Sequence, residues 1–185
     1  EISCSLVGSE MCIRDSTKAE GGEQALSHPE YLAFLHLILD TDCADLLDIE
    51  FFTAGADLPK LVEQAHSAGV AVVCSSHDFA KTPPRAELVS RMVQMQQAGA
   101  DLPKLAVMPR CRSDVLELLA ATAEMADHHP ETPVITMSMG ALGAVSRLAG
   151  ETFGSAMTFA NPGQASAPGQ VSLDIVNEVL NALHL

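Results

Sequence analysis

The sequence predicts an α/β protein built from parallel βαβ units, and two observations support this fold class. Apolar, strand-like runs alternate with helical patterns from about residue 27 to the last residues, and strands separated by helices pair in parallel through right-handed crossovers. No glycine-rich phosphate loop follows any of these runs, which counts against a nucleotide-binding sheet. A doubly wound sheet and a (β/α) barrel both fit the alternation, and periodicity alone does not separate them.

Five runs have the length and apolar character of buried strands. They lie at 45–52, 70–75, 105–108, 134–139 and 155–160. Helical patterns separate them, and a last helix is expected over about 173–183. Ser27 and Glu30 fit a capping box at the start of the first helix. Thr82 with Pro83 is expected to cap the helix whose apolar stripe contains Leu88.

Composition narrows the class of protein. The 185 residues are enough for one domain with a core. The net charge of −14 argues against a nucleic-acid partner, and no run is apolar enough to span a membrane. The five cysteines form no CxxC pair and no metal-ligand spacing, so we expect no metal site. Their odd number, without a secretion signal, predicts reduced thiols and a cytoplasmic location.

The residues that could carry chemistry lie in a few segments. His77 lies in SSHDFAKTP, Lys104 in GADLPKLAVMP and Arg147 in VSRLAGETFGSA, while a loop rich in Gly, Pro and Ser contains SAPGQ. A buried lysine can form a Schiff base with a ketone, and a histidine beside it can move a proton. Lys104 follows His77 by 27 positions, and Arg147 follows Lys104 by 43. In these segments and spacings the chain, from about residue 20 onward, resembles the type I 3-dehydroquinate dehydratases.

The resemblance implies a cofactor-free lyase of the shikimate pathway, which leads to the aromatic amino acids. This enzyme dehydrates the small molecule 3-dehydroquinate to 3-dehydroshikimate. By resemblance, Lys104 forms the imine, and His77 takes the proton from the carbon next to the imine and helps the hydroxyl to leave as water. Glu20, in KAEGGEQ, orients His77 through a hydrogen bond.

Three further residues would hold the substrate by resemblance. Arg147 would bind the substrate carboxylate, and Ser166 and Gln170 would hold its hydroxyls from a loop that closes over it. Three apolar residues resemble pocket-lining positions, although core packing explains them equally well: Met137, Met139 and Phe159. For Arg147 the alternative is a surface salt bridge with Glu151, four positions later in a helix.

The resemblance selects the (β/α)8 TIM-barrel family over the doubly wound sheet. Such a barrel needs about 250 residues, so we expect an incomplete barrel with about five C-terminal strands. The segment 1–16, EISCSLVGSEMCIRDS, resembles translated adaptor sequence. We therefore expect a foreign segment over 1–16 and a partial barrel domain over 17–185, inactive by itself. Alternatively, ISCSLV is a divergent but genuine strand, because its residues favour strands.

Two patterns leave the placement of charged residues to be decided. The seven residues GADLPKL occur twice, and only the second copy runs into an apolar strand, so Lys104 is expected on a strand and Lys60 on an exposed helix. Burial in an apolar barrel would favour the neutral, nucleophilic amine of Lys104. Asp48 and Glu50 share one face of a strand. They face either a polar barrel interior or the helices outside it.

Two other functions fit parts of this pattern. A class I aldolase also uses a strand lysine, although no phosphate loop is evident and GGEQ, SSHD and SAPGQ favour the dehydratase. An inactive fragment that at most binds a partner is the second alternative, because an incomplete barrel exposes sheet edges. Two copies of the chain could cover one another's edges as a homodimer.

Overall fold

The computed structural model describes residues 3–7, 10–14, 17, 25–41, 44–161 and 171–183. The chain divides into two compact units. The first, unit 1, consists of Glu1–Ser76 and Met95–Leu102, and the second, unit 2, consists of His77–Gln94 and Pro103–Leu185. Along the described residues no helix has the length and apolar character needed to cross a membrane.

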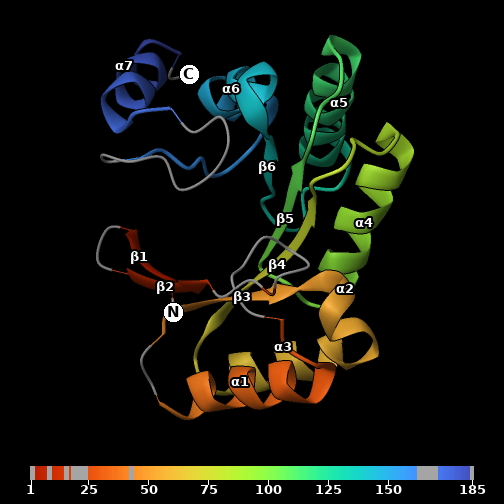
Figure 1. The fold of residues 1–185 in the computed structure, drawn as a ribbon, viewed down its shortest axis with the longest axis vertical. Helices are drawn as coiled ribbons and strands as arrows, with labels where there is room; N and C mark the ends of the chain where they lie inside the picture. The colour runs from red at the N-terminus through yellow and green to blue at the C-terminus, as the bar shows by residue number, and fades with distance from the viewer. Residues whose placement is uncertain are drawn as a thin grey trace. The chain divides into compact units, whose positions relative to one another are not determined.

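Unit 1 contains a sheet whose parallel strands are connected along the chain by helices (Figure 1). The strands are β1 (Ser3–Val7), β2 (Glu10–Arg14), β3 (Leu46–Glu50) and most of β4 (Ala71–Asp78). The helices are α1 (His28–Asp40), α2 (Phe51–Ala54) and α3 (Leu58–Ser67), with the 3-10 turn η2 (Gly55–Asp57) between the last two. β1 and β2 are antiparallel, whereas β2–β3 and β3–β4 are parallel.

The segment 1–16 contains two strands. β2 pairs with β3 through Cys12 opposite Leu46 and Ile13 opposite Leu47. Residues 3–7 of the strand-like run ISCSLV form β1, which pairs only with β2 among the described residues. The second half of the segment therefore provides the parallel neighbour of β3 that comes earlier in the chain, and the run that the alternative took for a genuine strand is not paired with β3. The foreign origin of residues 1–16 stays a prediction.

The core of unit 1 lies around β3, which is buried along its whole length. The first helix begins as expected, because Ser27 and Glu30 form a capping box. Helix α1 presents the buried Tyr31, whose hydroxyl accepts the Glu50 backbone N–H at 2.8 Å. Burial raises the pKa of the Tyr31 phenol above its usual value, so this hydroxyl stays neutral. A side-chain hydrogen bond joins α1 to α3, since His36 Nε2 lies 3.1 Å from Gln64 Oε1.

Unit 2 contains most of β5 (Leu102–Val107), which pairs in parallel with β6 (Ile135–Ser138). Its helices are most of α4 (Arg85–Gln97), α5 (Arg112–His128), α6 (Gly140–Leu148) and α7 (Leu173–Leu183), with the 3-10 turn η3 at Glu151–Phe153. Figure 1 shows α5 alongside β5 and β6, and α6 beside α7. On the helical side of β6, Thr136 bonds to Thr122 of α5 at 2.7 Å, and the Ser138 N–H donates to Ser146 of α6 at 2.8 Å.

Two expected features are wrong. Residues 155–160 form no regular strand, and only one bridge joins Ser155 to Val134. The Ser155 hydroxyl accepts the Thr136 N–H at 3.1 Å and so takes a bond that a ladder carbonyl would otherwise receive. Thr82 does not cap α4, because the helix begins at Arg85 and the carbonyl of Pro84 accepts its first bonds.

The same turn precedes β4 and β5. After α3, Gly69 has a φ of +77°, its N–H donates to His66, and the N–H of Val70 donates to Ala65. After α4 the pattern repeats at Gly99, which has a φ of +94°, with bonds to Gln96 and from Ala100 to Met95. This arrangement is the Schellman motif, in which glycine accepts the left-handed conformation without steric cost. We call these two segments, 68–70 and 98–100, the Ala-Gly turns.

Candidate active site

Lys104 lies within β5, and its side chain is buried, with 2% of its surface exposed. It stands opposite Ile135 of β6, and Ala106 stands opposite Met137. Because alternate residues of a strand share a face and paired residues of parallel strands point to the same side, these four side chains lie on one face of the β5–β6 pair. This is the face opposite to α5 and α6.

Arg147 reaches this face from α6. Its side chain is 2% exposed, and its Nη1 donates to the Met137 sulfur at 3.5 Å. The guanidinium is therefore buried and not at the surface, and a salt bridge with Glu151 stays an alternative. The backbone carbonyl of Arg147 accepts the Thr158 hydroxyl at 2.9 Å, which fixes the segment after η3 against α6.

Phe159 completes the group around Lys104. The Lys104 Nζ lies 5.3 Å from the centroid of the Phe159 ring, within the range of a cation–π interaction. Met139 is also buried, and its N–H donates to the carbonyl of Val107 at 2.8 Å. Unit 2 therefore brings an amine and a guanidinium together among sulfur and aromatic side chains.

His77 lies near the end of β4 and is half-buried. Its imidazole is nearly parallel to the Phe79 ring, with an interplanar angle of 14° and 6.1 Å between centroids. The next residue, Asp78, turns its carboxylate to the backbone, where Oδ1 accepts the N–H groups of Ala80 and Lys81. Asp78 thus forms a local turn.

The end of β4 is bonded to the segment that follows β5. The N–H of Met108 donates to the carbonyls of Asp78 at 2.9 Å and of Lys81 at 3.3 Å. The strand end that carries His77 and the strand that carries Lys104 are therefore neighbours within unit 2. Parallel barrels place their active sites at these carboxyl ends of strands.

Three expected site residues, Glu20, Ser166 and Gln170, lie outside the described residues. Their roles stay predictions. The described residues also contain no group of three or more His, Cys, Asp or Glu side chains arranged to hold a metal ion.

Asp48 and Glu50 are both buried, with 4% and 1% of their surfaces exposed. They stand opposite Val73 and Ser75 of β4. The carboxylate of Glu50 accepts the Thr17 N–H at 2.5 Å, the Thr17 hydroxyl at 2.9 Å and the Thr53 hydroxyl at 2.5 Å. Glu50 precedes α2 but makes no side-chain cap bond to its backbone. Its carboxylate instead anchors the residue that follows the segment 1–16.

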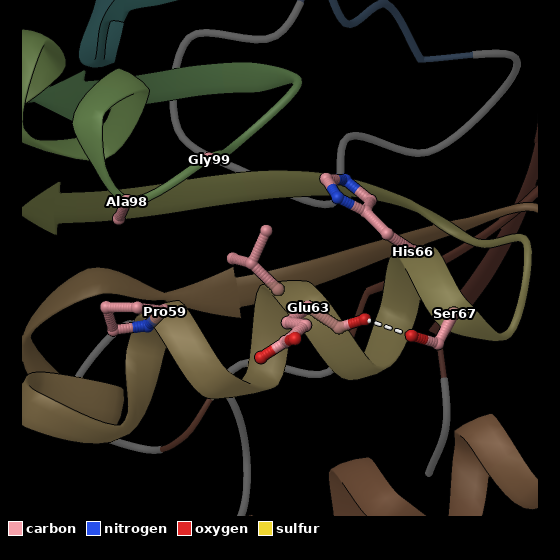
Figure 2. Close-up of a pocket in the computed structure, with 7 residues that line it drawn as sticks. Pro59, Glu63, His66, Ser67, Ala98 and Gly99 are labelled. Atoms are coloured by element: carbon pink, nitrogen blue, oxygen red, sulfur yellow. Dashed lines mark hydrogen bonds between the residues drawn. The ribbon is translucent and has the colours of Figure 1, made fainter.

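An open groove of about 450 Å³ lies in unit 1, away from these residues (Figure 2). Helix α3 and the second Ala-Gly turn form it, and its lining residues are Pro59, Val62, Glu63, His66, Ser67, Ala98 and Gly99. Within it His66 bonds to Asp101 at 2.8 Å, and the same Asp101 oxygen accepts the Val72 N–H. These bonds connect the turn to β4, and the groove contains none of the predicted site residues.

The fold and the site together indicate the class of protein: a (β/α) barrel with a buried lysine on one of its strands. The family model for type I 3-dehydroquinase matches residues 11–185. The chain therefore belongs to the type I 3-dehydroquinase family. The match begins inside the segment 1–16, at the start of which β1 lies.

Relatives and solved structures agree with this assignment. The chain is 49% identical over 165 residues to the 3-dehydroquinate dehydratase of Salmonella agona, which covers 89% of this chain and 66% of the relative. It is similar to a crystal structure of the type I enzyme from Clostridium difficile, with covalently modified comenic acid, at 47% identity and a TM-score of 0.86, over 94% of this chain and 67% of that one. The Geobacillus kaustophilus enzyme gives 40% identity and the same TM-score, over 93% and 66%.

The chain thus spans slightly less than two thirds of the length of the curated relatives it matches. The structural similarity confirms the fold class, an α/β fold of the TIM-barrel family that is incomplete in this chain.

Sequence reasoning missed two contacts near His77 in unit 2 and one in unit 1. Phe79 stacks on His77, Arg110 bonds across to the loop after β4, and Thr17 anchors Glu50. The adjacent Asp-Phe pair after His77 was the only signal for the first, and the other two join residues 30 and 33 positions apart.

Proposed function

We propose that this chain carries the Schiff-base and proton-transfer residues of a 3-dehydroquinate dehydratase. The observation that supports this most directly is the buried Lys104 on β5, on the same face as Met137 and the guanidinium of Arg147. A lysine in such a place is a nucleophile for a ketone, and a planar guanidinium suits a carboxylate. Membership in the family identifies the expected substrate, 3-dehydroquinate.

The reaction proceeds through an imine between Lys104 and the ketone carbon, with loss of one water. His77 then takes the proton from the neighbouring carbon, the electron pair forms the new double bond, and the hydroxyl leaves as water with a proton from His77. A further water hydrolyses the imine and frees the lysine. The net change is the loss of one water from 3-dehydroquinate. Arg147 would hold the substrate carboxylate, with Ser166 and Gln170 on its hydroxyls and Glu20 behind His77.

The test needs a protein with the residues that this chain lacks relative to its relatives. We define the extended protein as residues 17–185 of this chain, preceded by the residues of the Salmonella agona relative that come before its matched region. Borohydride with 3-dehydroquinate should trap an adduct, and peptide mass spectrometry should place it on Lys104. Lys104→Met should abolish it, while Lys60→Met, in the other copy of GADLPKL and exposed on α3, should not. An adduct on Lys60, or none, contradicts the assignment.

The two alternatives predict different results in the same experiment. An aldolase would cleave its substrate between carbons, whereas the extended protein should release only 3-dehydroshikimate; the family model and the relatives do not favour the aldolase. An inactive fragment is tested with the 185-residue chain, for which we expect no turnover. Turnover by this chain alone at the rate of the extended protein would contradict the expectation that strands are missing.

We propose further that the protein is cytoplasmic, binds no nucleic acid and forms a homodimer. Among the described side chains, the buried Cys74 and the exposed Cys111 are free thiols, which supports a reducing compartment. Cell fractionation tests the location, sedimentation equilibrium tests the dimer, and a gel-shift assay with duplex DNA and single-stranded RNA tests the absence of binding. A monomeric 185-residue chain would contradict the dimer, because the dimer would cover the exposed sheet edges of this incomplete barrel.

A further inference from the structure

We propose that Phe79 is a positioning residue for His77, and that two hydrogen-bonded backbone carbonyls hold Phe79 in place for this purpose. The inference rests on the proposed function, because it assigns Phe79 to the proton-transfer step. Phe79 would not contact the reacting atoms, so it makes and breaks no bond. It would act by fixing the plane of the imidazole.

The contact itself is the first argument. The two rings are 14° from parallel and 6.1 Å apart, which is an offset-stacked pair. Phe79 is 43% exposed, although a phenylalanine that only stabilises the fold is usually found in the core. Its apolar ring therefore lies partly in solvent and against the imidazole. A pair of this kind favours one ring orientation over others by about two- to tenfold.

The support of the ring is the second argument. The carbonyl before Phe79, of Asp78, accepts the N–H of Met108 at 2.9 Å, and the carbonyl after it, of Ala80, accepts Arg110 Nε–H at 2.9 Å. Both donors belong to the segment that follows β5, the strand of Lys104. The Asp78 carboxylate also accepts the N–H groups of Ala80 and Lys81, and these bonds hold the loop that contains Phe79 in a tight turn. The backbone on both sides of Phe79 is thus fixed to the segment that follows the strand of the nucleophile.

The chemistry gives this arrangement a purpose. General-base catalysis needs the imidazole nitrogen in line with the proton that it removes, and small errors of orientation slow the transfer. Imine formation at Lys104 does not use the imidazole plane in the same way. A loss of ring stacking should therefore slow the dehydration more than it slows imine formation.

The kinetic test compares Phe79→Leu, which keeps apolar volume without a ring, with Phe79→Tyr, which keeps the ring. In the extended protein we expect kcat to fall about two- to tenfold in Phe79→Leu, while the fraction of Lys104 trapped by borohydride does not fall. Phe79→Tyr should have the same kcat as the wild type. Phe52→Leu, at a phenylalanine that is 58% exposed in unit 1, is the matched control and should change nothing. A kcat for Phe79→Leu equal to that of the wild type, or equal losses in turnover and trapping without rescue by tyrosine, would overturn the proposal.

A spectroscopic test in the 185-residue chain does not depend on activity. The ring current of Phe79 should displace the NMR signals of the His77 ring protons, so Phe79→Leu should move them and Phe79→Tyr should not. Arg110→Met should move the same signals in part, because it releases the Ala80 carbonyl, and Arg110→Lys should move them less. Unchanged His77 signals in Phe79→Leu refute the positioning role. If wild-type extended protein traps no imine, the proposed function fails by itself, whatever the NMR result.

Discussion

The carboxylate of Glu50 gives a prediction about stability that follows from its hydrogen bonds. Glu50→Ala removes the acceptor for two donors of Thr17 and one of Thr53 in a place where Glu50 is only 1% exposed. The hydroxyls can rotate to other acceptors, but the Thr17 N–H cannot. An unsatisfied buried donor costs about 1–3 kcal/mol, and the space left by the side chain costs about 1–2 kcal/mol more.

Release of a buried charge offsets part of this loss. We therefore expect Glu50→Ala to lower the free energy of unfolding by about 2–4 kcal/mol. Glu50→Gln keeps one acceptor oxygen and should lose about half as much. The chain has no tryptophan and one tyrosine. That residue, Tyr31, accepts the Glu50 N–H, so its fluorescence reports on this part of the core.

The assay is urea denaturation, followed by tyrosine fluorescence and by circular dichroism, in the 185-residue chain and in the extended protein. Glu63→Ala, at an exposed glutamate of α3, is the control and should stay within about 0.5 kcal/mol of the wild type. A Glu50→Ala midpoint equal to that of the wild type, with the same slope, would show that the bonds to Thr17 do not hold the chain.

Three further predictions concern proton transfer, pH and packing. In the extended protein His77→Ala should lower turnover about 10²–10⁴-fold while borohydride still traps the imine on Lys104, and near-normal turnover would disprove the shuttle. The hydrogen bond to Asp57, and after it the bond to the Thr53 carbonyl, raise the pKa of His28. The His28–Asp57 pair should therefore stabilise the fold fully below a pH of about 6.5, and this stabilisation should be lost as the pH rises through the raised pKa. The difference in urea midpoint between wild type and Asp57→Asn should shrink with rising pH, and a constant difference contradicts this prediction. Gly143→Ala would place a Cβ 2.3 Å from a backbone carbonyl oxygen, so thermal denaturation should show a loss of about 1–3 kcal/mol, and an unchanged melting temperature would show that α6 can shift.

The repeated segment GADLPKL shows that neighbouring residues decide which structure a segment adopts. The first copy enters α3, where Pro59 occupies the first turn and Lys60 is exposed, and the second enters β5, where Lys104 is buried. Identical residues took opposite structures because the polar pattern VEQAHSAG follows one and the apolar run AVMP follows the other. Proline is tolerated at a helix start and near a strand start. Both placements were predicted from this difference.

Other features could not be predicted, because they depend on partners distant in the chain. Residues 155–160 are as apolar as a strand, yet the Ser155 hydroxyl takes the bond that would extend the ladder. Hydrophobic patterns do not encode such competition between side chain and backbone. The buried position of Glu50 was left between two faces, since its stabilising donor, Thr17, lies 33 positions earlier. From residue 27 onward local sequence predicted most strands and helices. It failed where single long-range hydrogen bonds decided, and also at the start of α4, where Pro84 and not Thr82 precedes the helix.

The positions of the two Ala-Gly turns show that the two ends of β4 and β5 have different roles. They stand before β4 and β5, whereas His77, the loop with Phe79 and the Arg110 bond stand at or after the strand ends. A library of substitutions confined to 68–70 and 98–100 could therefore raise or lower the melting temperature without altering the chemistry. Asparagine in place of either glycine would keep the left-handed backbone accessible at a smaller strain than alanine. For a protein engineer, the turns that precede these strands are available for adjustment, and the loops that follow them are best left unchanged.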